Sequence, residues 1–308
     1  AVLWRTLTGM GSGGSNVPIM GLLAAWFTRK RRGLAMGAAV MGTSVGIIIT
    51  GALIPFILKT RGDEAWREGW FVLGICALGA GAAAWFLLRN RPGDVGQDPI
   101  GMEKGGSAEV QVAKGEDSLH WGRVYRSGVV WHLAMIYSMF GFSYIIYATF
   151  FKKYIVTEAG FGETDAGLVW QMVGWLGISC GLTWGWVSDR IGRKWGLAMV
   201  YLIQATAFLL FAMGKTAGPI WVSAILFGLT AWSIPAIMAA ACGDQLGPRM
   251  APAAIGFVTL FFGIGQAVAP SVAGRIADQT GSFSTAYLCA AAAALLGGTG
   301  SLFLRKSH

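Results

Sequence analysis

The amino-acid sequence predicts an all-α polytopic membrane protein, and three observations support that fold class. The chain of 308 residues is 55% hydrophobic but only 13% charged, with 14 tryptophans. Its mean hydropathy is +0.57, whereas water-soluble domains carry about 25% charged residues. The charges are also gathered into short segments, between which long stretches contain no Asp, Glu, Lys or Arg. Such spacing is typical of a chain that crosses a membrane many times.

Each uncharged stretch is predicted to be one transmembrane helix. All are at least 20 residues long, and about 20 apolar residues of helix cross the hydrocarbon core of a bilayer. They run over residues 6–28, 33–58, 69–88, 127–151, 166–188, 195–214, 216–243, 250–274 and 279–304. They are apolar nearly all round, which excludes the surface helices of a soluble protein. They also lack the alternation of a barrel strand.

The basic residues predict the orientation of these nine helices. When the loops are taken in alternation, one side of the membrane holds 16 Lys and Arg and the other holds 8. Cytoplasmic loops carry the excess of bases. We therefore expect a protein of the cytoplasmic (inner) membrane, with the linker over residues 89–126 and the C-terminus in the cytoplasm. This bias also explains the net charge of +9, and no nucleic-acid partner is expected because the bases are scattered among loops.

The distribution of polar residues divides the chain into three parts. Residues 89–126 form its only long polar segment, rich in glycine and charge, which is typical of a flexible linker. We therefore predict a partial N-terminal bundle over residues 1–88, a cytoplasmic linker over 89–126 and a C-terminal six-helix bundle over 127–308.

An internal repeat relates the first and last parts of the chain. A shift of 217 residues places Pro18 on Pro235 and Arg32 on Arg249, and it carries the stretch 69–88 onto 286–305. Internal repeats of this kind are common in secondary transporters. The stretches between residues 127 and 214 have no counterpart under this shift, so we expect the chain to be a fragment holding the last nine helices of a twelve-helix protein.

One charged loop combines acid, base and glycine: residues 185–194 read GWVSDRIGRK. Gly185 and Gly192 allow close backbone approach. Asp189 could face the positive N-terminal end of a neighbouring helix or pair with Arg190 or Arg193. The alternative is a charge cluster that only sets the topology.

This loop resembles the G-x-x-x-D-R-x-G-R-[KR] signature of the major facilitator superfamily. The start of the chain, Arg5 to Gly11, resembles the R-x-x-x-G motif of that family's fourth helix, and residues 26–37 are similar to the fourth-to-fifth helix region of bacterial monocarboxylate and oxalate/formate-type members. The resemblance covers the whole chain and implies a major facilitator fold, here helices four to twelve. The stretch 166–188 departs from many monocarboxylate carriers in lacking Asp and Arg.

The resemblance implies a conformational latch in the signature loop, with Asp189 touching no substrate and the helix that starts near Met250 as its partner. The latch residues are Gly185, Asp189, Arg190, Gly192, Arg193 and Lys194.

Polar side chains inside the helices are candidates for the substrate cavity, because polar groups are costly in lipid and tend to face a bundle interior or a water-filled cavity. They share helical faces by their spacing. The candidates are Arg5, Ser12, Asn16, Tyr137, Tyr144, Gln171, Trp175, Thr230, Ser233, Thr259 and Gln266. Packing between helices is the alternative for the Tyr and Trp members, and Arg5 could instead extend to the membrane interface.

Two classes of function remain open at this point. The first is a secondary active transporter that moves a small solute, such as a monocarboxylate or another organic anion, by alternating access. Its partners would be the substrate, the lipid bilayer and a coupling proton or other ion, and it would act as a monomer. The second is a non-transporting membrane sensor or scaffold with the same fold. An enzyme, a cofactor and a metal site are not expected, because the helices contain no acid pair, His cluster or activated nucleophile.

Overall fold

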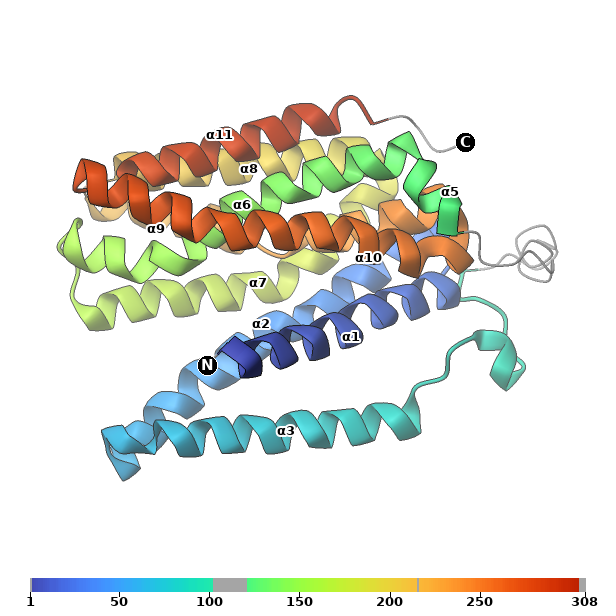
Figure 1. Ribbon diagram of the computed structural model, residues 1–308, viewed down its shortest axis with the longest axis horizontal. Helices are drawn as coiled ribbons and strands as arrows, with labels where there is room; N and C mark the ends of the chain where they lie inside the picture. Colours follow the sequence, from blue (N-terminus) through green and yellow to red (C-terminus); the bar gives the residue numbers. More distant parts are fainter. Residues whose placement is uncertain (1, 102–120, 215, 305–308) are drawn as a thin grey trace.

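The computed structural model describes residues 2–101, 121–214 and 216–304, which form a bundle of long helices (Figure 1). In chain order the elements are α1 (Val2–Trp26), α2 (Arg29–Arg61), η1 (Asp63–Ala65), α3 (Trp66–Leu87), η2 (Pro92–Val95), α5 (Trp121–Arg126), α6 (Gly128–Thr157), α7 (Glu163–Ile191), α8 (Arg193–Met213), α9 (Ala217–Gly228), α10 (Ser233–Thr280) and α11 (Ser284–Ser301).

The predicted all-helical membrane fold is confirmed. Seven helices in the described part of the chain are long and apolar enough to cross a membrane. They are Lys30–Thr50, Trp66–Leu87, Gly128–Thr157, Asp165–Ile191, Arg193–Met213, Ala217–Gly247 and Met250–Thr280. The N-terminal helix α1 and the last helix α11 are not among these seven, so the expected count of nine stays a prediction.

The long helix α10 consists of two successive segments. Gly247 interrupts it with φ 76° and ψ 168°, a conformation open to glycine because it has no Cβ. Pro248 follows, and proline suits the first position of a helix, where its missing N–H costs nothing. The break falls between the predicted stretches 216–243 and 250–274, so each stretch has its own helical segment.

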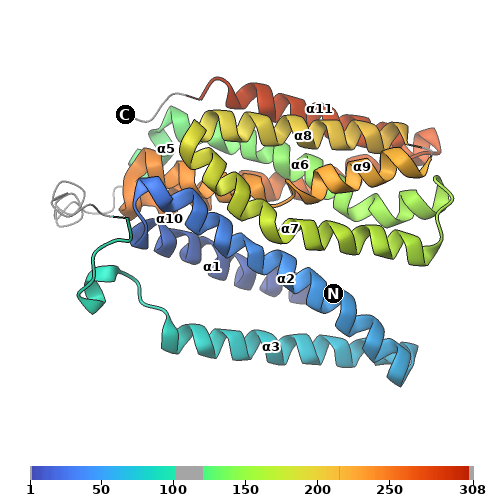
Figure 2. The ribbon, with the colours of Figure 1, turned by 180° about the vertical axis from the view of Figure 1, so that it is seen from behind.

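The densest packing lies among the helices that follow residue 127. The ring of Tyr147 on α6 packs against Phe211 and Phe227, with centroid distances of 4.7 and 4.3 Å. Its hydroxyl bonds to Ser223 Oγ at 3.0 Å. By contrast, α3 buries only Gly69 and lies outside α1 and α2, away from α6 to α11, in both views (Figures 1 and 2). The helices from α6 onward therefore form one packed body.

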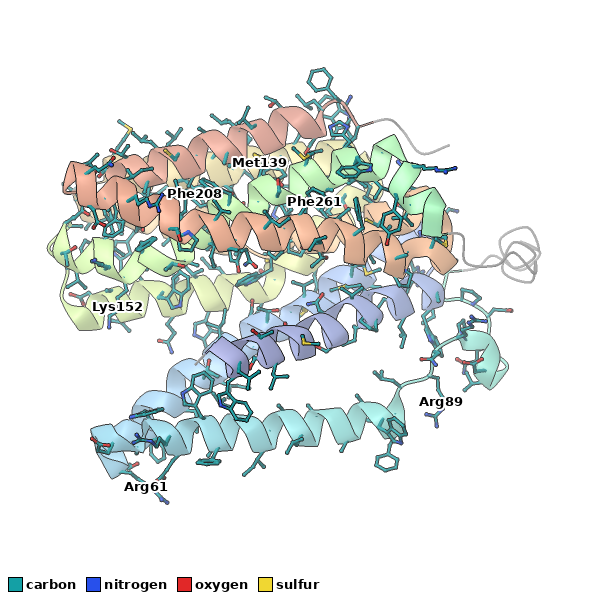
Figure 3. All side chains as sticks on the ribbon, viewed as in Figure 1. Arg61, Arg89, Met139, Lys152, Phe208 and Phe261 are labelled. Atoms are coloured by element: carbon teal, nitrogen blue, oxygen red, sulfur yellow. The ribbon has the colours of Figure 1, made fainter. Side chains whose placement is uncertain are left out.

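The two ends of the molecule differ. At one end, here called the linker end, α1 ends, α2 begins, and both lie beside α10 and α5; from there α2 diverges from α7 toward Arg61 (Figures 1 and 2). Arg61 and Lys152 lie at the opposite end from Arg89 (Figure 3). At that opposite end α6 still contacts the turn between α10 and α11, where the Phe283 N–H donates to Glu158 Oε1 at 2.8 Å.

The first part of the predicted linker is tied to the turn between α1 and α2. The Ile100 amide donates to the Trp26 carbonyl at 2.8 Å, and the Thr28 amide donates to the Ile100 carbonyl at 3.1 Å. The Trp26 indole donates to the Arg89 carbonyl at 2.9 Å. Residues 102–120 lie outside the described residues, and the division into three domains stays a prediction.

Candidate functional site

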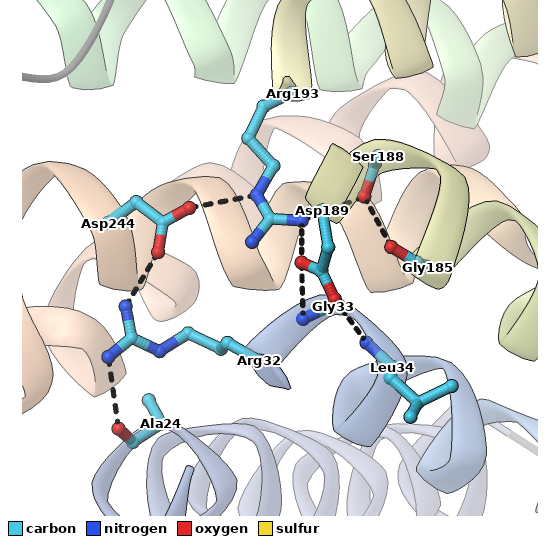
Figure 4. Close-up of polar contacts among 9 residues, drawn as sticks. All are labelled: Ala24, Arg32, Gly33, Leu34, Gly185, Ser188, Asp189, Arg193 and Asp244. Carbon is cyan, nitrogen blue, oxygen red and sulfur yellow. Dashed lines mark hydrogen bonds and ion pairs between the residues drawn. The ribbon is translucent and has the colours of Figure 1, made fainter. Parts of the chain in front are cut away.

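Asp189, in the last turn of α7, binds the backbone near the beginning of α2. Its Oδ1 accepts the Gly33 N–H and its Oδ2 accepts the Leu34 N–H, each at 3.0 Å (Figure 4). A carboxylate at this place also meets the positive end of the α2 dipole. The prediction that Asp189 pairs with the helix that starts near Met250 is therefore wrong. The reason is that α7 runs antiparallel along α2, which puts the end of one beside the start of the other.

A chain of alternating charges continues from Asp189 into the protein. Arg193 at the start of α8 pairs with Asp189, and its Nε donates to Asp244 Oδ2 at 2.8 Å. The other oxygen of Asp244 accepts from Arg32 Nη1 at 2.6 Å. Two acids and two bases from α7, α8, α10 and α2 thus neutralise one another at the linker end (Figure 4). We call Arg32, Asp189, Arg193 and Asp244 the charge cluster.

Side-chain and backbone acceptors hold both arginines further. Arg193 Nη1 donates to Ser188 Oγ at 2.7 Å, and Ser188 in turn donates to the Gly185 carbonyl at 2.8 Å. Arg32 Nη2 lies 3.4 Å from the Ala24 carbonyl. The orientation of both guanidinium groups is therefore set by several elements at once.

Glycines let α2 and α7 approach closely beside the charge cluster. A Cβ added at Gly33 would lie 2.6 Å from the Gly185 carbonyl oxygen, and one at Gly181 would lie 2.6 Å from the Gly37 carbonyl oxygen. The glycines recur every four residues on each helix, the small-xxx-small spacing that allows helix backbones to touch in membranes. We call Gly33, Gly37, Gly181 and Gly185 the glycine seam.

The predicted latch residues take different places around this cluster. Gly192 has a φ of 93° and makes the turn between α7 and α8. Arg190 is exposed, with its guanidinium carbon 3.8 Å from the centroid of Trp186, and Lys194 Nζ lies 5.6 Å from the ring of Trp195. These two bases thus lie over tryptophan rings rather than in the charge cluster. A latch role for any of the six stays a prediction.

Arg32, Gly33 and Asp244 belong to this site although the sequence patterns did not predict them as members. Two signals were available. Arg32 keeps its place in both copies of the repeat, and Asp244 is an isolated acid directly after the uncharged stretch 216–243. Neither signal shows which helix Arg32 or Asp244 contacts.

Two cavity candidates in the later helices meet. Gln266 Nε2 on α10 donates to the Tyr144 hydroxyl on α6 at 2.8 Å. Tyr137 is buried and stacks on Phe262 at 4.6 Å, while Thr259 is half-buried.

Two further candidates are joined through the backbone, since the Ser233 N–H donates to the Thr230 carbonyl at 3.1 Å. Thr230 and Ser233 are buried, and their hydroxyls donate to the Leu226 and Cys180 carbonyls at 2.8 and 3.4 Å. The exposed candidates are Ser12, Asn16, Gln171 and Trp175. The side chain of Arg5 lies outside the described part of the structure. A substrate role stays a prediction for each candidate.

Comparison with known proteins adds family information to this geometry. The family model described as "Uncharacterised MFS-type transporter YbfB" matches residues 1–302. The chain is 24% identical to the "Probable sulfoacetate transporter SauU" of Cupriavidus necator over 98% of this chain and 72% of that protein. It is 25% identical to the "Membrane sensor protein UhpC" of Salmonella typhimurium over 89% of this chain and 64% of that protein.

A solved structure shares the fold. The human organic anion transporter MFSD10 superimposes with a TM-score of 0.70 at 16% sequence identity, covering 94% of this chain and 68% of that protein.

Proposed function

Because this chain belongs to the MFS-type transporter family, we propose that it moves a small organic anion across a bacterial inner membrane by alternating access. The linker end faces the cytoplasm in this proposal, in agreement with the excess of bases in the loops on that side. The major facilitator signature in residues 185–194 and the match over residues 1–302 support the same class of activity, a transporter rather than an enzyme.

The contact between α2 and the later helices is the observation that carries this proposal. Asp189, Arg193 and Asp244 come from the packed body of α6 to α11, whereas Arg32 and the amides of Gly33 and Leu34 come from α2. These interactions exist only while the two parts meet at the linker end. Rocking of one part against the other would break them and open this end, as alternating access requires.

In this proposal the charge cluster holds α2 against the later helices at the linker end. With the linker end in the cytoplasm, this arrangement is closed to the cytoplasm. The charge cluster and the glycine seam then serve as the cytoplasmic gate.

The substrate class rests on the relatives and on Arg5. One relative is described as a sulfoacetate transporter and the similar solved structure as an organic anion transporter. Arg5 is the basic residue directly before the predicted stretch 6–28, near the outer end of its helix, and in this proposal it faces the cavity and attracts an anion. In this proposal, transport is coupled to a proton or another ion, or the anion moves down its own gradient by facilitated diffusion. The protein works as a monomer.

Uptake by the purified chain in liposomes tests the function. We expect saturable uptake of radiolabelled sulfoacetate or lactate but not of a neutral sugar of similar size. Arg5→Gln should abolish this uptake, whereas Arg61→Gln should not, since Arg61 lies in an exposed pair with Glu68. Folded protein that accumulates neither acid would contradict the proposal.

A membrane sensor is the second candidate, favoured by the similarity to UhpC. A sensor would bind the anion without moving it. Binding measured by titration together with an absence of uptake would therefore identify this function.

A further inference from the structure

A cavity of about 280 Å³ lies between α7, α8 and the end of α9. In the rear view α7 and α8 diverge from the turn that joins them, and α9 lies between them toward the other end of the molecule (Figure 2). Thr183 on α7 and Leu229 after α9 line the cavity and are exposed, so it opens to the surface. A water molecule takes up about 30 Å³ of liquid, and the cavity therefore has room for a larger group.

This cavity faces away from α2. Gly181 and Gly185 bring α7 against α2, whereas Thr183 and Val187, which line the cavity, each lie two residues further along α7. Two residues of an α-helix are about 200° apart around its axis, so the cavity and the glycine seam lie on opposite sides of α7. Because α7 and α8 are long and apolar enough to cross a membrane, the outer side of this helix pair faces lipid.

The wall of the cavity suits hydrocarbon. The hydroxyls of Thr183 and Thr230 donate to carbonyls four residues earlier in the chain, at 3.0 and 2.8 Å, and the Trp184 indole donates to the Leu229 carbonyl at 3.0 Å. The polar side chains of the wall are thus already bonded within the protein. Its remaining side chains are apolar: Val187, Ile203, Leu226 and Leu229. A polar solute would lose its hydrogen bonds to water here, whereas an apolar chain would not.

Two bases lie at the linker end of this cavity. Arg190 comes three residues after Val187 on α7, on the same helical face and about 4.5 Å further along the axis. Its guanidinium lies over the ring of Trp186, and Lys194, in the first turn of α8, lies over Trp195. Within the described part of the chain neither base has an acid as a partner. Both tryptophans are exposed, and tryptophan is typical of the membrane–water interface.

An apolar cavity below two positive charges matches the two halves of an anionic phospholipid. The acyl chain is hydrocarbon, and the phosphate carries the negative charge that Arg and Lys bind. Basic pockets between transmembrane helices on the cytoplasmic side are known to bind such head groups. A neutral phospholipid would bring the same acyl chain but no net charge for the two bases, so charge complementarity favours the anionic lipid.

We propose that α7, α8 and α9 form a binding site for one anionic phospholipid, with its phosphate on Arg190 and Lys194 and one acyl chain in the cavity. The leaflet is the cytoplasmic one in the orientation proposed above. The site lies on the opposite side of α7 from the contact with α2, so it is separate from the charge cluster and from any substrate path between the two parts. It goes beyond the proposed transport and does not depend on the substrate.

Native mass spectrometry of the purified full chain in detergent tests the head-group contact. The chain is titrated with phosphatidylglycerol or with phosphatidylcholine of identical acyl chains. We expect one phosphatidylglycerol to bind about tenfold more tightly than phosphatidylcholine, and the double variant Arg190→Gln with Lys194→Gln to lose this preference. Arg61→Gln with Arg67→Gln removes the same charge from exposed pairs elsewhere and should keep it. Equal binding of both lipids by wild type, or an unchanged preference in the first double variant, would overturn the proposal.

A second pair of variants tests the acyl-chain contact. Ile203→Trp places a large side chain in the cavity and should weaken the binding of both lipids about tenfold. Leu202→Trp changes the neighbouring residue, which is 58% exposed and does not line the cavity, and should bind as wild type does. Melting temperatures show that the variants are folded, and Val187→Phe replaces Ile203→Trp if the latter does not fold. Wild-type lipid binding by the folded cavity variant would overturn the site, while the uptake assay would still decide transport independently.

Discussion

Arg32 and Asp244 form an ion pair that joins α2 to α10, with 2.6 Å between Nη1 and Oδ1 and side-chain exposures of 6% and 4%. The two residues are 212 positions apart in sequence, with the whole polar linker between them. Asp244 also accepts from Arg193, so one carboxylate neutralises two guanidinium groups. The stability of the closed linker end therefore depends strongly on this acid.

Asp244→Asn should destabilise the protein strongly. The substitution leaves two buried guanidinium groups facing an amide, and breaking a buried pair costs about 3–5 kcal/mol. Thermal unfolding in detergent, followed by intrinsic fluorescence, measures the effect. Glu64→Gln is the control, because the pair of Glu64 with Arg67 is largely exposed and such pairs contribute about 0–1 kcal/mol. Equal melting temperatures for the two variants would show that the cluster does not stabilise this arrangement.

Asp189→Asn should shift the protein toward opening at the linker end. The variant loses the charge that binds the start of α2, a contact worth about 0.3–1 kcal/mol and up to about 2 kcal/mol when partly buried. That loss changes a two-state population several-fold without unfolding the chain. Maleimide labelling of a Val40→Cys reporter, buried in wild type, should therefore accelerate, and transport should slow.

The control for this prediction is Arg190→Gln. Arg190 is exposed and lies over Trp186 outside the charge cluster, so its removal should leave the labelling rate unchanged. Equal labelling rates for Asp189→Asn and wild type would instead support the alternative interpretation, in which the charges of residues 185–194 only set the membrane topology.

Gly37→Ala should separate α2 from α7. An added Cβ would overlap the Gly181 carbonyl, and backbone cannot move aside without opening the glycine seam. We expect lower thermal stability together with loss of transport. Gly42→Ala on the same helix has nothing within 4 Å of its added Cβ, and alanine favours a helix over glycine by about 1 kcal/mol. That control should be neutral or stabilising, and a similar loss in both variants would point to a general effect of the substitution.

The composition and charge spacing were sufficient to predict the all-helical membrane fold, because each uncharged stretch is long enough to cross a bilayer by itself. The signature in residues 185–194 was sufficient to predict the family, which the match over residues 1–302 confirms. Gly192 and the Gly247–Pro248 pair mark breaks between helices through local backbone geometry. All these properties are local, so the sequence alone determines them.

The partner of Asp189 was decided only by the tertiary structure. Helical spacing shows which residues share a face, but not which helix lies opposite. The prediction of the helix near Met250 failed for that reason, and the amides of Gly33 and Leu34 take its place. Likewise, nothing local relates Arg32 to Asp244. These relations arise because glycines on α2 and α7 allow the two backbones to touch, which brings residues far apart in sequence into one site.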